Sequence, residues 1–153
     1  MNSRSFLYLS VMFIMCFCTA AQAETFDKYL SAADIEKVTG FKEVKLSKSS
    51  QQGSAGSLQF RNKDGKVILL VRFNSPSFYN KAEATKLGQI KGEIQGIGED
   101  AYYGPNAATP YMLSFKKNKL YVELTAYINS KDVMPFLTME QLKALGKIIA
   151  SRI

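Results

Sequence analysis

One short segment of the chain has the spacing of a nucleotide-binding loop. The hexapeptide Gly96–Ala101 fits the pattern G-x-G-x-x-A, in which glycines let the backbone approach a pyrophosphate. Such a loop follows a buried strand and opens a helix. Here glycine and proline residues follow the segment, and Glu99 and Asp100 place negative charge where phosphate would lie. We therefore expect a turn, with both glycines at positive φ, that leads into a strand at 101–103.

Two other patterns with chemical potential predict no site. Ser114 and Lys117 have the S-x-x-K spacing of acyl-enzyme serines, but they fall on an expected strand entering a turn. Residues three apart do not face each other there as they would on a helix. The adjacent acids Glu99 and Asp100 fall short of the six to eight oxygen ligands that calcium takes. We expect neither a catalytic serine nor a metal site from these residues.

Composition limits the available chemistry further. The chain has no histidine, and its two cysteines, Cys16 and Cys18, lie in an N-terminal segment that we expect to be removed. Ser-His and Cys-His nucleophile pairs are therefore excluded, and zinc, haem and copper lose their usual ligands. We expect no cofactor and no metal. An enzyme would need two carboxylates roughly 5–10 Å apart across a cleft, and the candidates are Glu99, Asp100, Glu123 and Asp132.

Residues 1–23 have the organisation of a secretory signal peptide. One cation, Arg4, precedes an apolar run at 6–17, and a small-residue site, Ala-Gln-Ala, ends at Ala23. The apolar run is shorter than the roughly 20 residues of a permanent membrane helix. We expect cleavage after Ala23, export to the periplasm or secretion without a permanent membrane anchor, and a single domain at 24–153.

The mature chain left by this cleavage is basic and free of cysteine. Loss of Arg4 removes one of the 20 cations, so 19 cations face 13 anions with a net charge of +6. This excess favours anionic partners. In an exported protein we expect acidic envelope components or another exported protein as the partner, and no nucleic acid. The absence of cysteine suits an oxidising compartment.

The first and last helices are marked by capping boxes. Ser31 with Asp34 opens a helix at about 32–39, and Thr138 with Gln141 opens the closing helix. An apolar stripe at helical spacing supports the second of these helices. Its members are Leu142, Leu145, Ile148, Ile149 and Ile153.

Between these helices, segments in which apolar and polar residues alternate predict strands. Hairpins are expected at 58–73, turning at Asp64-Gly65, and at 111–128. A helix that opens at Ser75-Pro76 and ends near Gly88 separates them. With single strands before each hairpin, the order is α-β-β-β-α followed by β-β-β-α. We expect an α+β domain in which helices pack on an antiparallel sheet of about six strands, with a possible α-β-β-β internal pseudo-repeat.

Basic residues at the two hairpin turns are one set of binding candidates. If both turns lie at the same edge of the sheet, they form a cationic rim suited to phosphate or carboxylate groups; otherwise they serve to keep the turns soluble. The residues are Arg61, Lys63 and Lys66 at the first turn, and Lys116, Lys117 and Lys119 at the second.

Tyrosines are the second set of candidates. Amphipathic rings on an open sheet face could stack on a sugar or anchor a partner protein. The alternative is that helices cover that face and the hydroxyls bond internally. Tyr121 and Tyr127 share the face opposite the aliphatic one, and the set comprises Tyr102, Tyr103, Tyr121 and Tyr127.

Several of these segments resemble a known class of domains. The turn GIGEDAYYG, the hairpin after it and the closing EQLKALGKIIASRI are similar to small exported bacterial domains, a largely uncharacterised family. The resemblance covers about Gly96–Ile153 and, more weakly, the opening LSAADIEKVTGF. It implies export and an α+β fold, and it carries no catalytic residue. The chain departs from the commoner pattern at Glu99 and at Gly146, where alanine is more usual.

These observations predict an exported, non-catalytic binding or interaction protein with a cationic, tyrosine-rich surface. One alternative is the carboxylate-dependent envelope hydrolase described above. Another is an inhibitor or chaperone-like partner protein, because a helix followed by antiparallel strands also suits a cystatin-like grip.

Overall fold

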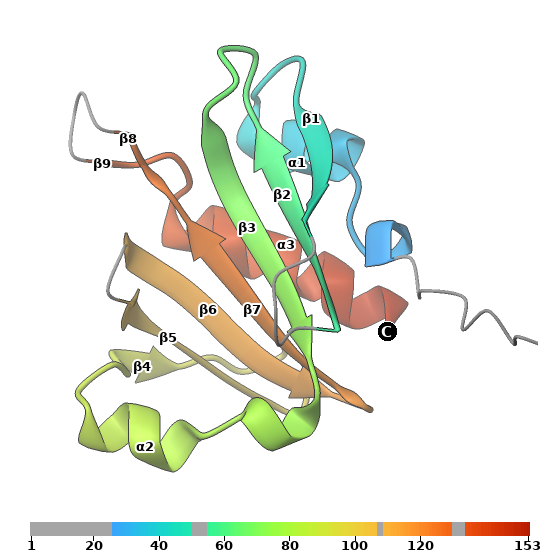
Figure 1. Cartoon of the computed structure of the whole chain (residues 1–153). Helices are drawn as coiled ribbons and strands as arrows, with labels where there is room; N and C mark the ends of the chain where they lie inside the picture. Colours follow the sequence, from blue (N-terminus) through green and yellow to red (C-terminus); the bar gives the residue numbers. More distant parts are fainter. Residues whose placement is uncertain (1–25, 50–54, 107–108, 130–133) are drawn as a thin grey trace, which may run out of the picture.

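The computed structural model describes residues 26–49, 55–106, 109–129 and 134–153 (Figure 1). The expected signal peptide and Asp132 therefore lie outside the described residues. No helix within the described ranges is long and apolar enough to span a membrane.

Seven strands in these ranges form one antiparallel sheet with the order β1-β2-β3-β7-β6-β5-β4 (Figure 1). The α+β class with an antiparallel sheet is thus confirmed. The two-residue strand β4 and a separate pair, β8–β9, are additional to the expected strands. The bounds are β1 Lys45–Ser49, β2 Gly56–Arg61, β3 Val67–Asn74, β4 Gly92–Glu93, β5 Asp100–Asn106, β6 Thr109–Lys117, β7 Leu120–Ala126, β8 Ile128–Asn129 and β9 Met134–Pro135.

The sheet consists of a three-stranded meander, β1-β2-β3, and a four-stranded one, β4-β5-β6-β7, joined where β3 pairs with β7. In this central pair, Leu69 lies opposite Ala126 and Asn74 lies opposite Tyr121. The β2–β3 turn precedes β3 and the β6–β7 turn precedes β7. Because the two strands are antiparallel, these turns lie at opposite ends of the sheet (Figure 1).

Helices α1 and α3 cover one face of the sheet and form the main core with it. They lie behind the sheet in Figure 1, whereas α2 lies near its lower edge beside β4. The core includes Ile35 from α1 and Leu142, Leu145 and Ile149 from α3, all fully buried. Of the expected α3 stripe, Ile148 and Ile153 are only partly buried. The helical elements are η1 Phe26–Lys28, α1 Ala32–Thr39, η2 Pro76–Phe78, α2 Lys81–Lys86 and α3 Met139–Arg152.

Both expected capping boxes are present, but the middle helix is broken. Its first turn is η2, after which Asn80 leaves helical geometry with φ −126° and ψ 74° and caps α2 anew by accepting from the backbone N–H of Glu83. Helix α2 packs on Tyr102 and Met112, which belong to the face opposite α1. Both β1-β2-β3 and β5-β6-β7 are thus meanders preceded by a helix. The two helices differ in position, because α1 and α2 pack on opposite faces of the sheet.

The GIGEDAYYG segment is a turn, as expected from its sequence. Gly96 and Gly98 have φ values of 78° and 62°, and β5 begins directly afterwards at Asp100. A Cβ atom on Gly98 would lie 2.2 Å from the backbone oxygen of Lys116. Between the glycines, the Ile97 side chain is buried in the main core. A Cβ on Gly146 would lie 2.7 Å from Leu113, so the glycine on α3 lets this helix approach the sheet.

Candidate functional site

The face of the sheet opposite α1 and α3 carries a continuous row of polar residues. Register pairing places Arg72 of β3 opposite Glu123 of β7, Glu123 opposite Ser114 of β6, and Ser114 opposite Tyr102 of β5. Cross-strand partners share a face, so the four side chains project to the same side. We call this side the polar face.

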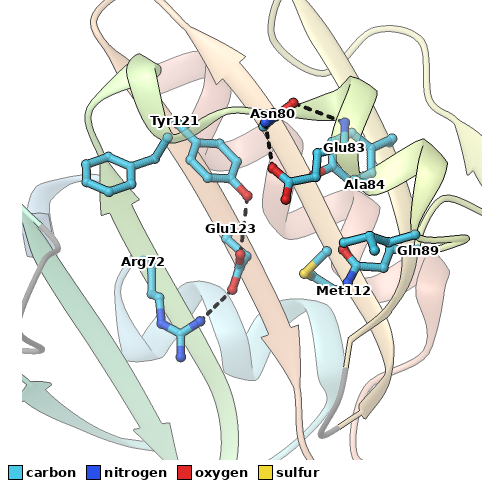
Figure 2. A pocket seen from close by; sticks show the side chains of 11 residues that line it. Arg72, Asn80, Glu83, Ala84, Gln89, Met112, Tyr121 and Glu123 are labelled. Carbon is cyan, nitrogen blue, oxygen red and sulfur yellow. Dashed lines mark hydrogen bonds and ion pairs between the residues drawn. The ribbon is translucent and has the colours of Figure 1, made fainter.

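A pocket of about 510 Å³ lies on the polar face, between the sheet and residues 76–89 (Figure 2). Its volume is within the range of small-molecule sites. We call it the polar-face pocket. Strands supply Arg72, Tyr102, Met112, Tyr121 and Glu123, and the segment from η2 to the end of the α2 turn supplies Phe78, Asn80, Glu83, Ala84, Leu87 and Gln89.

Glu123 is the centre of the hydrogen-bond network in the pocket floor (Figure 2). Its carboxylate accepts from the Arg72 guanidinium at 2.7 Å, the Tyr121 hydroxyl at 3.2 Å and the Thr125 hydroxyl at 3.4 Å. The Ser114 hydroxyl lies 3.4 Å from that of Tyr121. Because Tyr121 donates to Glu123, Ser114 is the donor in that contact. The floor is therefore polar, fully bonded at Glu123 and close to electrically neutral.

Burial and the nearby Glu123 charge raise the pKa of Tyr121 above its ordinary value. The phenol therefore stays protonated at neutral pH and keeps donating to Glu123. The Arg72–Glu123 pair is partly shielded from water, with 34% and 15% of the two side chains exposed. The Arg72–Glu123 pair and the hydrogen bond from Tyr121 thus connect β3 and β7 across the polar floor.

The segment Pro76–Lys86, which we call the covering arm, is fixed to the sheet by ring packing. The Tyr79 ring lies 5.7 Å from that of Tyr102 and 5.3 Å from that of Tyr121, and Lys116 Nζ lies 5.0 Å from the Tyr79 ring centre. The buried Tyr79 hydroxyl has no hydrogen-bond partner of regular geometry among the described residues. Burial, followed by the nearby Asp100 carboxylate, raises its pKa.

An ion-pair cluster fixes the same arm at its helix. Lys81 Nζ lies 2.7 Å from Glu93 and 2.9 Å from Asp100. The hydrogen bond from Lys81 lowers the pKa of Asp100. In turn, the hydrogen bonds to Glu93 first and to Asp100 second raise the pKa of Lys81. Lys81 and Asp100 are therefore both charged over the neutral range, and the two ion pairs link α2 to β4 and β5.

The pocket has an apolar rim. Phe78, within the covering arm, and Leu87, which directly follows it, are 61% and 63% exposed. Large apolar side chains with this much exposure are rare in the described part of the chain, where Met134 at 63% is the third. Two of these three side chains therefore lie at one pocket.

The basic residues do not form a common rim, because their two turns lie at opposite ends of the sheet. At the first turn, Arg61 donates to the Gly65 carbonyl and to Gln59, so it holds the hairpin. Lys63 is exposed and Lys66 is half-buried. The condition for a common cationic rim, that both turns lie at the same edge, is therefore not met in this register.

The three lysines at the second turn are also separated. Lys116 projects to the polar face over Tyr79, whereas Lys117 donates to the backbone carbonyl of Ala150 at the end of α3. Successive strand residues point to opposite faces, which explains the division. Of the three lysines, only Lys119 is exposed.

The tyrosine candidates divide in the same way. Tyr102 and Tyr121 are buried and line the polar-face pocket. Tyr103 pairs with Leu113 on the opposite face, where Lys143 Nζ lies 5.9 Å from its ring. Tyr127 is half-buried and does not line the pocket. The arm covers part of this face and the Tyr121 hydroxyl bonds internally, as the second alternative for the tyrosines describes.

The carboxylates weighed for hydrolysis are each held by other partners. Glu99 accepts from the backbone N–H of Asn118 in the β6–β7 turn. Asp100 pairs with Lys81, and Glu123 pairs with Arg72. Asp132 lies outside the described residues. Each of these three described acids thus already binds a cation or a backbone N–H group.

The sequence analysis missed Arg72 and the polar residues of the covering arm. Arg72 is the one charged residue in VILLVRFN, and Glu123 is the one charged residue in LYVELTA. A lone cation and a lone anion on two apolar strands are a signal for a cross-strand pair. Asn80 and Glu83 gave no such signal because their position depends on the break before α2.

Comparison with protein-family models, curated proteins and solved structures gave no match. Among the described residues, no group of three or more acidic residues is placed to hold a metal ion. The fold and site define an α+β domain with a mixed polar and apolar pocket on one sheet face. Such an arrangement can hold a ligand through hydrogen bonds and ring contacts.

Proposed function

We propose that the protein is exported to the periplasm or secreted, and that it is a non-catalytic binding protein whose ligand occupies the polar-face pocket. The exposure of Phe78 and Leu87 at its rim carries this proposal. A ligand covering both side chains would gain about 25 cal/mol for each Å² of apolar surface removed from water.

Export is supported by the signal-peptide pattern of residues 1–23 and the absence of cysteine after it. The formal net charge of +7 for the whole chain supports attraction to acidic envelope components. Binding rather than catalysis is supported by the pocket floor, where Glu123 holds Arg72 and two hydroxyl groups.

Replacing Phe78 with serine is expected to weaken ligand binding about tenfold or more, because an exposed ring that packs on the ligand is lost. The water-soluble envelope fraction of the native cell is titrated into ¹⁵N-labelled protein, and the amide shifts of the pocket residues give an apparent affinity.

Met134→Ser is the matched control, since Met134 is 63% exposed and does not line the pocket. It should leave the titration unchanged. Equal weakening by the two substitutions, or no weakening by Phe78→Ser, would exclude the pocket as the binding site.

A further inference from the structure

We infer that the ligand of the polar-face pocket is a saccharide, a segment of an envelope glycan whose ring face lies on the Phe78 rim and whose hydroxyl groups bond to the polar lining. This inference rests on the proposed function and gives the ligand a chemical class.

Planar polar side chains form one side of the pocket. Asn80, Glu83 and Gln89 line it together with the Arg72–Glu123 pair, and Figure 2 shows these groups around one hollow with Met112 and Tyr121. Amide and carboxylate groups offer donors and acceptors side by side. Sugar hydroxyls both donate and accept, so they can satisfy such a lining. Asn80 donates to Glu83 and Arg72 donates to Glu123, both at 2.7 Å, yet these groups keep further donors and acceptors. A hydrocarbon chain would bury that remaining capacity unfilled, which weakens binding.

The apolar groups are arranged to suit a ring rather than a long chain. Phe78 and Leu87 stand at the rim, and Ala84, Met112 and the Tyr121 ring lie among the polar lining. A pyranose ring has an apolar C–H face and polar edges. It can therefore contact the exposed Phe78 ring while its edge hydroxyls reach the amides.

The charge of the lining disfavours an ionised head group in the pocket. Arg72 is the one cation among the lining residues, and Glu123 neutralises it at 2.7 Å. The remaining lining charge is the negative Glu83. An uncharged sugar unit thus fits better than a fatty acid or a phosphate, while the net positive charge of the chain attracts the acidic polymer that carries the sugar.

The place of the pocket in the sheet disfavours an extended peptide. Extended peptides gain affinity by adding main-chain hydrogen bonds to a sheet edge. The pocket lies over β3, β5, β6 and β7, whereas the edges of the sheet are β1 and β4. No strand edge is therefore available at the pocket for main-chain pairing.

Fractionation of the native envelope tests the ligand class. Three fractions are titrated into the full-length labelled protein: a delipidated, protease-digested polysaccharide fraction, a peptide fraction and a lipid fraction presented as vesicles. The inference requires amide shifts at the pocket residues with the polysaccharide fraction alone, and at least tenfold weaker binding in Phe78→Ser. Shifts with only the peptide or lipid fraction would overturn the saccharide class and leave the proposed function standing. No shift with any fraction would overturn both.

A substitution in the lining separates hydrogen bonding from apolar contact. Gln89→Leu should weaken binding of the polysaccharide fraction about five- to tenfold, because an amide partner of a sugar hydroxyl is replaced by an alkyl group. Gln95→Leu, at an exposed position outside this pocket, is the control and should have no effect. Unchanged or tighter binding in Gln89→Leu would mean that the ligand meets this wall of the pocket with apolar surface, which contradicts a saccharide.

Discussion

Gly104→Ala is expected to lower the free energy of unfolding by about 3 kcal/mol or more, the largest effect of any substitution considered. Gly104 lies in β5 opposite Met112. A Cβ atom there would lie 1.6 Å from the carbonyl oxygen of Gln89 and 3.3 Å from the Cα of Ile90. Both atoms belong to the backbone, so the segment around Gln89 and Ile90 would have to move away from β5. Thermal or denaturant unfolding followed by circular dichroism measures the loss.

Gly65→Ala is the control for this prediction. Gly65 has φ 75°, but nothing lies within 4 Å of its Cβ position. Only the conformational cost remains, about 1 kcal/mol. A loss for Gly104→Ala no greater than that for Gly65→Ala would show that the Gln89 segment moves away from β5 easily, and that the pocket wall it forms is not rigid.

Asp34→Ala is expected to remove about 2 kcal/mol of stability at neutral pH, the second-largest effect. The Asp34 carboxylate accepts from the backbone N–H and the hydroxyl of Ser31, which completes the capping box of α1. It also accepts two bonds from Arg152 at 2.7 and 2.8 Å, linking α1 to the end of α3. The cap contributes about 1 kcal/mol. The pair contributes about 1 kcal/mol at most, because 39% of the Arg152 side chain is exposed.

The stabilisation by the Asp34 carboxylate depends on pH and decreases in acid. The Arg152 hydrogen bonds hold the pKa of Asp34 well below its ordinary value in the folded protein. The stabilisation is therefore fully present above the unfolded pKa of about 3.9, and it is lost as the pH falls toward the folded pKa. The difference in unfolding free energy between the wild type and Asp34→Ala should shrink progressively below about pH 4.

Glu140→Gln provides the matched comparison for the Asp34 prediction. Glu140 pairs with Lys143 on α3, but 81% of its side chain is exposed. Its removal should change stability by less than about 0.5 kcal/mol. A pH-independent difference for Asp34→Ala would mean that its ionised form makes no special contribution, contrary to the geometry around Arg152.

Local features of this fold could be predicted from the sequence because their causes are local. The Ser31/Asp34 and Thr138/Gln141 capping boxes depend on residues three apart, and both were placed correctly. The positive φ values of Gly96 and Gly98 follow from a turn that needs them.

The arrangement of the candidate site depends on pairing between distant strands, which short-range sequence patterns do not reveal. The antiparallel β3–β7 pair sends the two basic turns to opposite ends, and nothing within either hairpin indicates that choice. The pocket further requires the break at Asn80, which turns α2 onto Tyr102 and Met112. A continuous helix from Ser75 would have satisfied the same local signals.

The central claim is that a ligand covers the rim of the polar-face pocket, and a single tryptophan tests it most directly. The chain contains no tryptophan, so Phe78→Trp and Met134→Trp each introduce one reporter at a similarly exposed site. On addition of the envelope polysaccharide fraction, the emission of the residue-78 reporter should shift to shorter wavelength, while that of the residue-134 reporter stays constant. Equal responses from both reporters, or none from residue 78, would contradict the account.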